Sequence, residues 1–241
     1  MEYEKFKLKL VEKLACINIE LPESKIRDFF TYMEELVEWN KKINLTAIVE
    51  MSDIIDKHFV DSLTISQYIN DNESIIDVGT GAGFPGIPLK IARDNLKIDL
   101  LDSLNKRVNF LSEIIDKLEL KNITAIHSRA EDESSKKEKR ENYDVAVSRA
   151  VANLPVLLEY LLPFVKLGGK CICMKGMNIE EEINNSKKAL KELGGEIEEV
   201  KKLQLPNTDA TRNIIIVRKI ANTPKKYPRK AGTATKSPIM W

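Results

Sequence analysis

The chain has 241 residues, of which 43% are hydrophobic, 31% charged and 6% aromatic. This composition is typical of a soluble protein of one or two domains, and it excludes collagen, a long disordered chain and a membrane protein. The formal net charge is only +1, and no segment approaches the roughly 18 consecutive apolar residues of a membrane span. Because the N-terminus also lacks a basic start followed by an apolar run, we expect a cytoplasmic protein without membrane contact.

The cysteines and histidines predict no metal site. Cys16, Cys171 and Cys173 form neither a disulfide framework nor a C-x-x-C pair, so we expect small, buried, reduced side chains. His58 and His127 each lack a partner histidine or cysteine at the spacing of metal ligands.

Residues 1–70 read as helical, with no strand candidate. Apolar residues recur at helical spacing from Tyr3 to Ile17, and again from Ile26 to Val37 after Pro22. A third helical segment is predicted over 52–69, with Ser52 as its N-cap. We therefore expect an N-terminal helical extension.

From residue 74 the pattern changes to short apolar runs that alternate with helical segments. Such runs are typical of a parallel sheet covered on both faces, so we predict a Rossmann-like α/β domain over 71–220 with a mostly parallel, seven-stranded sheet. A strand near 197–205 should pair with the last strand as an antiparallel hairpin. The other strand candidates are 75–78, 98–101, 123–126, 145–147, 171–174 and 214–217, and the helix candidates are 87–92, 104–118, 154–164 and 179–193.

Charge is distributed unevenly along the chain. All 37 acidic residues lie at or before Asp209, and eight of the 38 basic residues follow it, so the body carries 30 minus 37, or −7, and the tail +8. This asymmetry favours an anionic partner for a basic arm over 221–241, although a tail that only aids solubility is the alternative. Nine of the twelve residues 131–142 are charged, which predicts a solvated loop or helix face without a specific role.

A glycine-rich loop, Asp77 to Gly86 with the sequence DVGTGAGFPG, follows the first strand and opens a helix. This is where a doubly wound sheet binds a nucleotide-like ligand. The dinucleotide fingerprint G-x-G-x-x-G needs a glycine at position 84, where Phe84 stands. The spacing G-x-G-x-G disfavours NAD or FAD and favours S-adenosylmethionine.

Polar residues at the ends of the next strands support a cofactor crevice. Asp102 follows the second strand, where a carboxylate can accept hydrogen bonds from both ribose hydroxyls of an adenosine; capping the helix that begins near Leu104 is the alternative. Ser128 to Glu131 end the third strand and Ser148 to Ala150 the fourth. For Arg149 the alternative is an ion pair with a surface carboxylate.

Several segments resemble the RsmG family, also called the glucose-inhibited division protein B (GidB) family, of bacterial 16S ribosomal RNA guanine-N7 methyltransferases. The resemblance covers nearly the whole chain. It is carried by the segments WNKKINLT (39–46), HFVDSL (58–63), DVGTGAGFPGIPL (77–89), LDSLNKR (101–107), SRA (148–150), KG (175–176) and YPRKAG (227–232).

The resemblance implies a class I S-adenosylmethionine-dependent methyltransferase that forms 7-methylguanosine at position 527 in the 530 loop of 16S rRNA. It places Arg149 and Lys175 in the active site, with Arg149 at the methionine end of the cofactor. The implied cofactor contacts are Gly79, Gly81, Phe84, Asp102, Ser103, Leu104, Ala130, Glu131 and Arg149. Lys106 and Arg129 match positive positions around the active site, and the cations that we expect to contact rRNA are His58, Lys106, Arg107, Arg129, Arg229 and Lys230.

Three alternatives stay open for individual side chains. Phe84 or Trp39 could stack on the target base, but for each of them the sequence favours a core position. His58 could contact RNA or pack the extension against the sheet. Lys106 and Arg107, at the start of a helix whose dipole they do not complement, could be only a surface pair.

Two other functions fit the sequence less well. One is a methyltransferase acting on a small molecule or a protein, since a fold does not fix a substrate. The other is a non-catalytic ribosome assembly factor on the same fold. Deleting 222–241 should separate an RNA substrate from the first alternative, and a cofactor-induced thermal shift should exclude the second. By default we expect a monomer.

Overall fold

The computed structural model describes residues 1–177 and 179–240. Its first part is helical, as predicted: α1 (Glu2–Ala15), α2 (Glu23–Ile43), α3 (Met51–Ile54), a π-helical turn (Ile55–Val60), α4 (Asp61–Leu63) and a 3-10 turn (Ser66–Tyr68). The prediction of Ser52 as an N-cap is wrong, because Glu50 holds the extended cap position and Ser52 lies inside the first turn.

A seven-stranded sheet follows, with the order β3-β2-β1-β4-β5-β7-β6. β1, β2, β3, β4 and β5 pair in parallel, while β7 runs antiparallel to β5 and β6. The predicted fold class and terminal hairpin are therefore confirmed. The strands are β1 (Ser74–Val78), β2 (Lys97–Asp102), β3 (Ile123–His127), β4 (Tyr143–Arg149), β5 (Val165–Lys175), β6 (Gly195–Gln204) and β7 (Thr211–Lys219).

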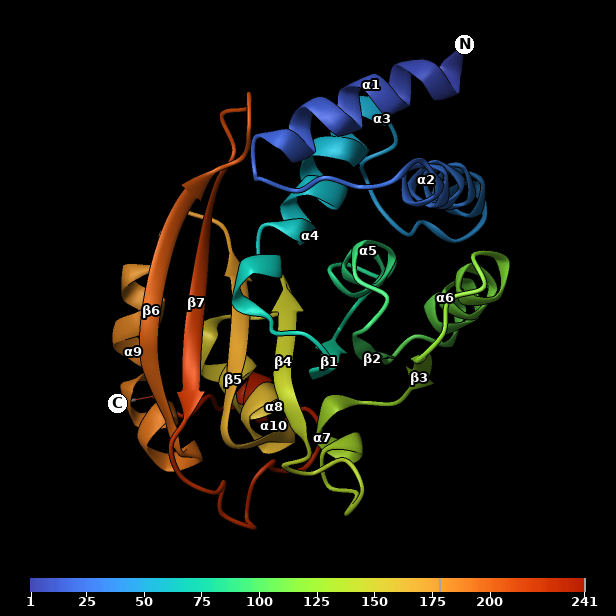
Figure 1. Ribbon diagram of the computed structural model, residues 1–241. Coiled ribbons are helices and arrows are strands. Elements are labelled where there is room, and N and C mark those ends of the chain that lie inside the picture. The colour runs from blue at the N-terminus through green and yellow to red at the C-terminus, as the bar shows by residue number, and fades with distance from the viewer. Residues whose placement is uncertain (178, 241) are drawn as a thin grey trace.

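Helices cover both faces of the sheet (Figure 1). Five of them connect or follow the parallel strands: α5 (Gly86–Ala92), α6 (Asn105–Lys117), α7 (Ala130–Glu133), α8 (Leu154–Leu161) and α9 (Glu180–Leu193). One apolar core lies between the sheet and α5, α6 and the N-terminal helices, and the other lies between the sheet and α8 and α9. This is the arrangement that alternating strands and helices predict.

The N-terminal helices share a core with the sheet. Phe6, Phe29 and Tyr32 are fully buried in the same cluster as Ile75 and Ile172 of the sheet. In Figure 1 these helices lie above the carboxyl edge of the central strands, next to α5 and α6. The extension can therefore supply side chains to a site at that edge.

The C-terminal arm, residues 221–240, is an ordered surface segment that includes the short helix α10 (Thr233–Lys236). Tyr227 and Ile239 of the arm are buried against the α8–α9 core. Arg140 donates to the carbonyl oxygens of Tyr227 (2.8 Å) and Thr223 (2.7 Å). The segment 131–142 thus lies largely at the surface, as predicted, but the expectation that it has no specific role is wrong for Arg140, because a run of charges in the sequence does not reveal which of them a distant segment contacts.

Two further expectations concern single features. No helix in the described ranges is long and apolar enough to cross a membrane. Cys171 and Cys173 are buried, as predicted, but Cys16 is exposed at the end of α1, so that prediction was wrong for Cys16.

Candidate active site

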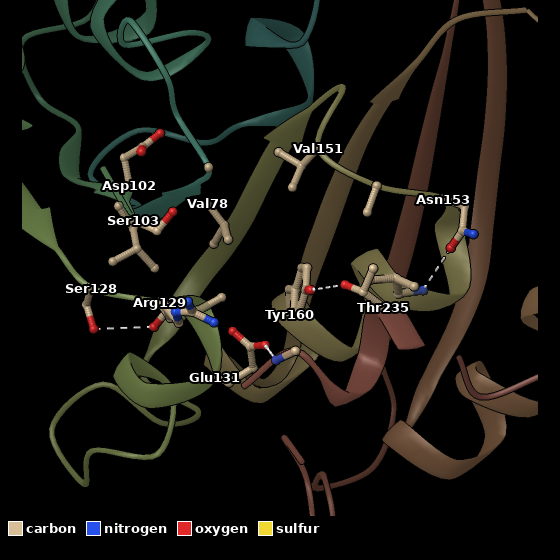
Figure 2. A pocket seen from close by; sticks show the side chains of 16 residues that line it. Val78, Asp102, Ser103, Ser128, Arg129, Glu131, Val151, Asn153, Tyr160 and Thr235 are labelled. Atoms are coloured by element: carbon tan, nitrogen blue, oxygen red, sulfur yellow. Dashed lines mark hydrogen bonds between the residues drawn. The ribbon is translucent and has the colours of Figure 1, made fainter. Parts of the chain in front are cut away.

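Two adjacent hollows open at the carboxyl edge of β1, β2 and β4. The first hollow has a volume of about 560 Å³ and the second about 420 Å³. Gly79, Asp102, Ser103 and Val151 line both. Figure 2 shows the first hollow, with Asp102 and Ser103 on one side and Tyr160 and Thr235 on the other. The predicted crevice is thus present, and it lies at the point where β1 has β2 on one side and β4 on the other.

Gly79 forms the floor between the two hollows. Its φ of +70° lies in the left-handed region that glycine tolerates. A Cβ built on Gly79 would lie 2.6 Å from Cγ2 of Val151, which the left-handed Ala150 (φ +55°) turns toward the loop. A side chain at position 79 would therefore both strain the backbone and clash with Val151.

The glycine loop is held from below by Asp77 and from the side by Tyr32. One carboxylate oxygen of the fully buried Asp77 accepts from the Thr80 hydroxyl (2.6 Å) and the Gly86 amide (2.8 Å), and burial raises the pKa of Asp77 to about 7. The Tyr32 hydroxyl donates to the carbonyl oxygen of Ala82. The loop conformation therefore depends on α2 as well as on β1.

Asp102 is a buried carboxylate at the end of β2, only 3% exposed. Its Oδ2 accepts from the Gly81 amide at 2.9 Å and lies 3.4 Å from Arg107 Nη1, and its Oδ1 accepts from the Leu104 amide at 2.9 Å. Both interpretations of Asp102 thus have support, because it stabilises the start of the next segment and also faces both hollows. A carboxylate has about four acceptor positions, so one is left for a ligand hydroxyl.

The opposite wall of the first hollow comes from three segments. Ser128 to Glu131 follow β3, Val156 and Tyr160 lie on α8, and Gly232 and Thr235 belong to the C-terminal arm. Sequence reasoning placed Ala130 and Glu131 here by resemblance but missed Tyr160 and the two arm residues. The only signal for the arm was its match to the family segment YPRKAG.

The second hollow is lined by cationic and aromatic side chains that include Arg149, Phe84 and His58. Arg149 is not paired with a surface carboxylate, as the alternative had it, but with the buried Asp61 at 3.2 Å, and Asp61 also accepts from Arg212 Nε at 3.1 Å. The Arg149 guanidinium lies 4.8 Å from the centre of the Phe84 ring. One buried carboxylate thus holds two arginines beside the glycine loop.

His58 joins the extension to β4 and is neutral in the folded protein. Its ring stacks on Phe84 with 4.3 Å between ring centres, Nε2 lies 2.9 Å from the Thr46 hydroxyl, and Nδ1 lies 3.3 Å from Nη2 of Arg149. Nδ1 also lies 3.2 Å from the carbonyl oxygen of Lys57, so in the neutral ring Nδ1 either accepts from Arg149 or donates to Lys57, depending on which nitrogen carries the proton. Burial and the charge of Arg149 lower the pKa of His58 to about 3.

The two aromatic candidates for base stacking pack against the N-terminal side of the core, Phe84 buried and Trp39 half-buried. Phe84 is buried, with His58 stacked on its ring. Trp39 packs against Phe110, donates to Glu113 (3.1 Å) and lines neither hollow. The favoured core position thus agrees with the packing of both residues, although Phe84 also lines the second hollow.

Two expected site residues lie outside the hollows. Leu104 is 52% exposed and lines neither of them. Lys175 donates to the Ala152 carbonyl oxygen (2.6 Å) and pairs with Glu182 (2.7 Å), whose carboxylate also accepts from the Leu154 amide. Lys175 thus holds the loop between β4 and α8 in place instead of pointing into the site.

The predicted RNA-binding cations divide into two groups. Lys106, Arg129 and Lys230 are exposed and form no ion pair within the described ranges. Arg107 contacts Asp102, and Arg229 pairs with the buried Glu159 at 2.6 Å. The prediction that Arg229 serves RNA is corrected, because its guanidinium neutralises a carboxylate that the protein has buried.

The tail charge is also largely neutralised. Five of its eight cations form ion pairs: Arg212, Arg218, Lys219, Lys226 and Arg229.

Within the described ranges, no three His, Cys, Asp or Glu side chains are placed to hold a metal ion.

Comparisons with known proteins agree with this geometry. A family model described as GidB, rRNA small subunit methyltransferase G, matches residues 25–215. The chain is 52% identical over 242 residues to a protein of Acetivibrio thermocellus named ribosomal RNA small subunit methyltransferase G, covering 99% of this chain and 100% of that protein. A protein of the same name from Clostridium perfringens is 50% identical over 231 residues, covering 94% and 97%. The solved structure of a SAM-dependent methyltransferase from Aquifex aeolicus has a TM-score of 0.51 and 20% identity, covering 70% of this chain and 93% of that one, and so shares the fold.

Proposed function

The chain belongs to the GidB family of rRNA small subunit methyltransferase G proteins, and on this premise we propose that it transfers the methyl group of S-adenosylmethionine to N7 of one guanosine in 16S rRNA. By its resemblance to the family, the target is position 527 in the 530 loop. The observation that carries the proposal is the first hollow, which the buried Asp102 and Gly79 of the glycine loop line together.

The residues present fit S-adenosylmethionine. A volume of about 560 Å³ lies within the roughly 300 to 1,000 Å³ of small-molecule sites. Asp102 would accept from the ribose, Ser103, Ala130 and Glu131 would surround the adenine, and Gly79 and Gly81 would let the backbone approach the ligand. Phe84 would support the loop from below. When bound, the cofactor supplies an electrophilic methyl group on a sulfonium.

The target atom needs no general base. Guanine N7 has a lone pair in the ring plane and no proton, so the protein must only exclude water and align the two reactants. Holding donor and nucleophile at about 3 to 3.5 Å can supply on the order of 7 to 11 kcal/mol. His58 is suited to such a site because its neutral ring neither adds charge nor removes a proton there.

Arg149 is the residue that we assign to the second hollow. A bidentate guanidinium on guanine O6 and N7 would cover the atom to be methylated. We therefore assign Arg149 to the cofactor carboxylate or to the substrate backbone, with Asp61 fixing its orientation. Normal affinity of Arg149→Ala for both cofactor and RNA would contradict both assignments.

The substrate would approach over exposed cations around the two hollows. Lys106 and Arg129 follow β2 and β3, and Lys230 lies on the C-terminal arm, so all three are available to phosphates. We further propose that the protein acts as a monomer in the cytoplasm on the small ribosomal subunit.

The test is transfer of labelled methyl to small subunits that lack this modification, followed by reduction and aniline cleavage at 7-methylguanosine. A single cleavage in the 530 loop is the expected result. Label elsewhere, or on a small molecule or protein, would overturn the substrate assignment. A non-catalytic assembly factor is distinguished by the absence of any thermal shift with S-adenosylmethionine.

A further inference from the structure

The C-terminal arm contributes to the first hollow although it follows the whole sheet in sequence. The other residues of the hollow all come from 78–160, whereas Gly232 and Thr235 come from the arm. Figure 2 shows Thr235 facing Tyr160 across the hollow from Asp102. The wall opposite the ribose side is therefore not part of the sheet and its crossovers.

The residues that fasten the arm are themselves residues of the hollow or their direct neighbours. Glu131 lines the hollow, and its Oε1 accepts from the Gly232 amide at 2.9 Å. Tyr160 lines it too, and its hydroxyl lies 3.0 Å from the Thr235 hydroxyl. The arm therefore cannot shift without changing the surface that a ligand meets.

A buried ion pair sets the position of this part of the arm. Glu159 is 0% exposed on α8, one residue before Tyr160. Its carboxylate accepts from the backbone amide of Arg229 (2.9 Å) and from Nε (2.9 Å) and Nη2 (2.6 Å) of the same residue. Three donors of one residue can reach one carboxylate in only one orientation, so the pair fixes the position of the arm relative to α8 and places Thr235 at the hollow.

We propose that the C-terminal arm is a wall of the cofactor pocket, so that docking of the arm and binding of the adenosine moiety stabilise each other. This inference rests on the proposed function for the identity of the ligand. Gly232 approaches the adenine beside Glu131, and the Thr235 and Tyr160 hydroxyls provide a polar edge. Because coupling between two binding events is reciprocal, the bound ligand must also hold the arm down.

The arm also carries exposed lysines next to this wall, Lys230 and Lys236. Deleting 222–241 would therefore remove part of the cofactor pocket together with these charges, and it would leave Glu159 buried without its partner. That deletion cannot separate an RNA substrate from other substrates, contrary to the expectation from the sequence.

Two measurements on the full chain test the inference with S-adenosylhomocysteine as the probe. The first is titration calorimetry of Thr235→Trp, at an exposed position that lines the hollow, against Ser237→Trp, at an exposed position that does not line it. Because an indole ring on this wall takes up volume and removes the hydroxyl that the ligand would meet, we expect Thr235→Trp to weaken binding by about tenfold or more, and Ser237→Trp to match the wild type. The second is tryptic cleavage of the wild-type arm after Lys230, which the probe should slow.

The results distinguish this inference from the proposed function. Equal affinity of Thr235→Trp and Ser237→Trp, or cleavage of the arm at the same rate with and without the probe, overturns the role of the arm and leaves the methyltransferase assignment intact. No binding of the probe to the wild-type chain overturns the proposed function itself.

Discussion

The stability of this protein should respond to pH through two buried groups at the site that act in opposite directions. The pKa of His58 is lowered to about 3 from 6.5, and the pKa of Asp77 is raised to about 7 from 3.8. Replacing His58 by Gln removes the pH response of His58 and leaves that of Asp77. The perturbation is therefore His58→Gln, measured at several pH values.

The signs follow from proton binding. Below pH 6.5 the unfolded chain protonates His58 but the folded protein does not, so the His58 contribution to stability falls as pH falls. At pH 5 the loss is about 1.5 pH units at about 1.4 kcal/mol each, or about 2 kcal/mol. Below pH 7 the folded protein protonates Asp77 and the unfolded chain does not until about 3.8, so the Asp77 contribution rises by about 3 kcal/mol at pH 5.

These two contributions nearly cancel in the wild type between pH 7 and 5. In His58→Gln only the Asp77 contribution is left, so the variant should gain about 2 kcal/mol relative to the wild type over this range. The assay is urea unfolding at constant ionic strength at pH 7.5, 6 and 5. His127→Gln, at an exposed position, is the matched control.

A stability difference between His58→Gln and the wild type that stays constant within about 0.5 kcal/mol from pH 7.5 to 5 would refute the reasoning. It would mean that the folded protein protonates His58. The contacts of Nδ1 with Arg149 and of Nε2 with Thr46 would then have been assigned to the wrong protonation state.

Three further predictions concern single side chains. Asp102→Ala should weaken S-adenosylhomocysteine binding in calorimetry by about tenfold or more, because the charge-assisted hydrogen bond to the ligand is lost, and the exposed Asp116→Ala should not change it. Arg229→Ala should lower the melting temperature in calorimetric scans by about 6 °C or more, because it leaves Glu159 buried and largely unpaired. Lys230→Ala is the control, and an equal shift in both variants would mean that the Arg229–Glu159 pair does not stabilise the fold. Arg129→Ala should reduce affinity for a 530-loop RNA and lower the salt slope of binding by about one, and an unchanged slope would mean that Arg129 meets no phosphate.

The sequence by itself determined the architecture and the place of the site. Short apolar runs alternating with amphipathic segments have one favourable arrangement, a parallel sheet covered on both faces. Every predicted strand lies within or largely within an observed one, although β5 begins at Val165, six residues before the predicted start. The glycine loop and Asp102 could be placed because they follow adjacent strands, whose carboxyl ends meet at one edge. These are local patterns whose consequences do not depend on contacts distant in sequence.

Only the tertiary structure decided which charged and aromatic side chains are free. Arg229, Lys175 and Phe84 carry the same chemistry in the sequence whether they face solvent or not, yet the fold places Arg229 on the buried Glu159, Lys175 on Ala152 and Glu182, and Phe84 beneath His58. In each case the partner lies on another element. Such pairings depend on how whole elements pack, and periodicity along one segment carries no record of them.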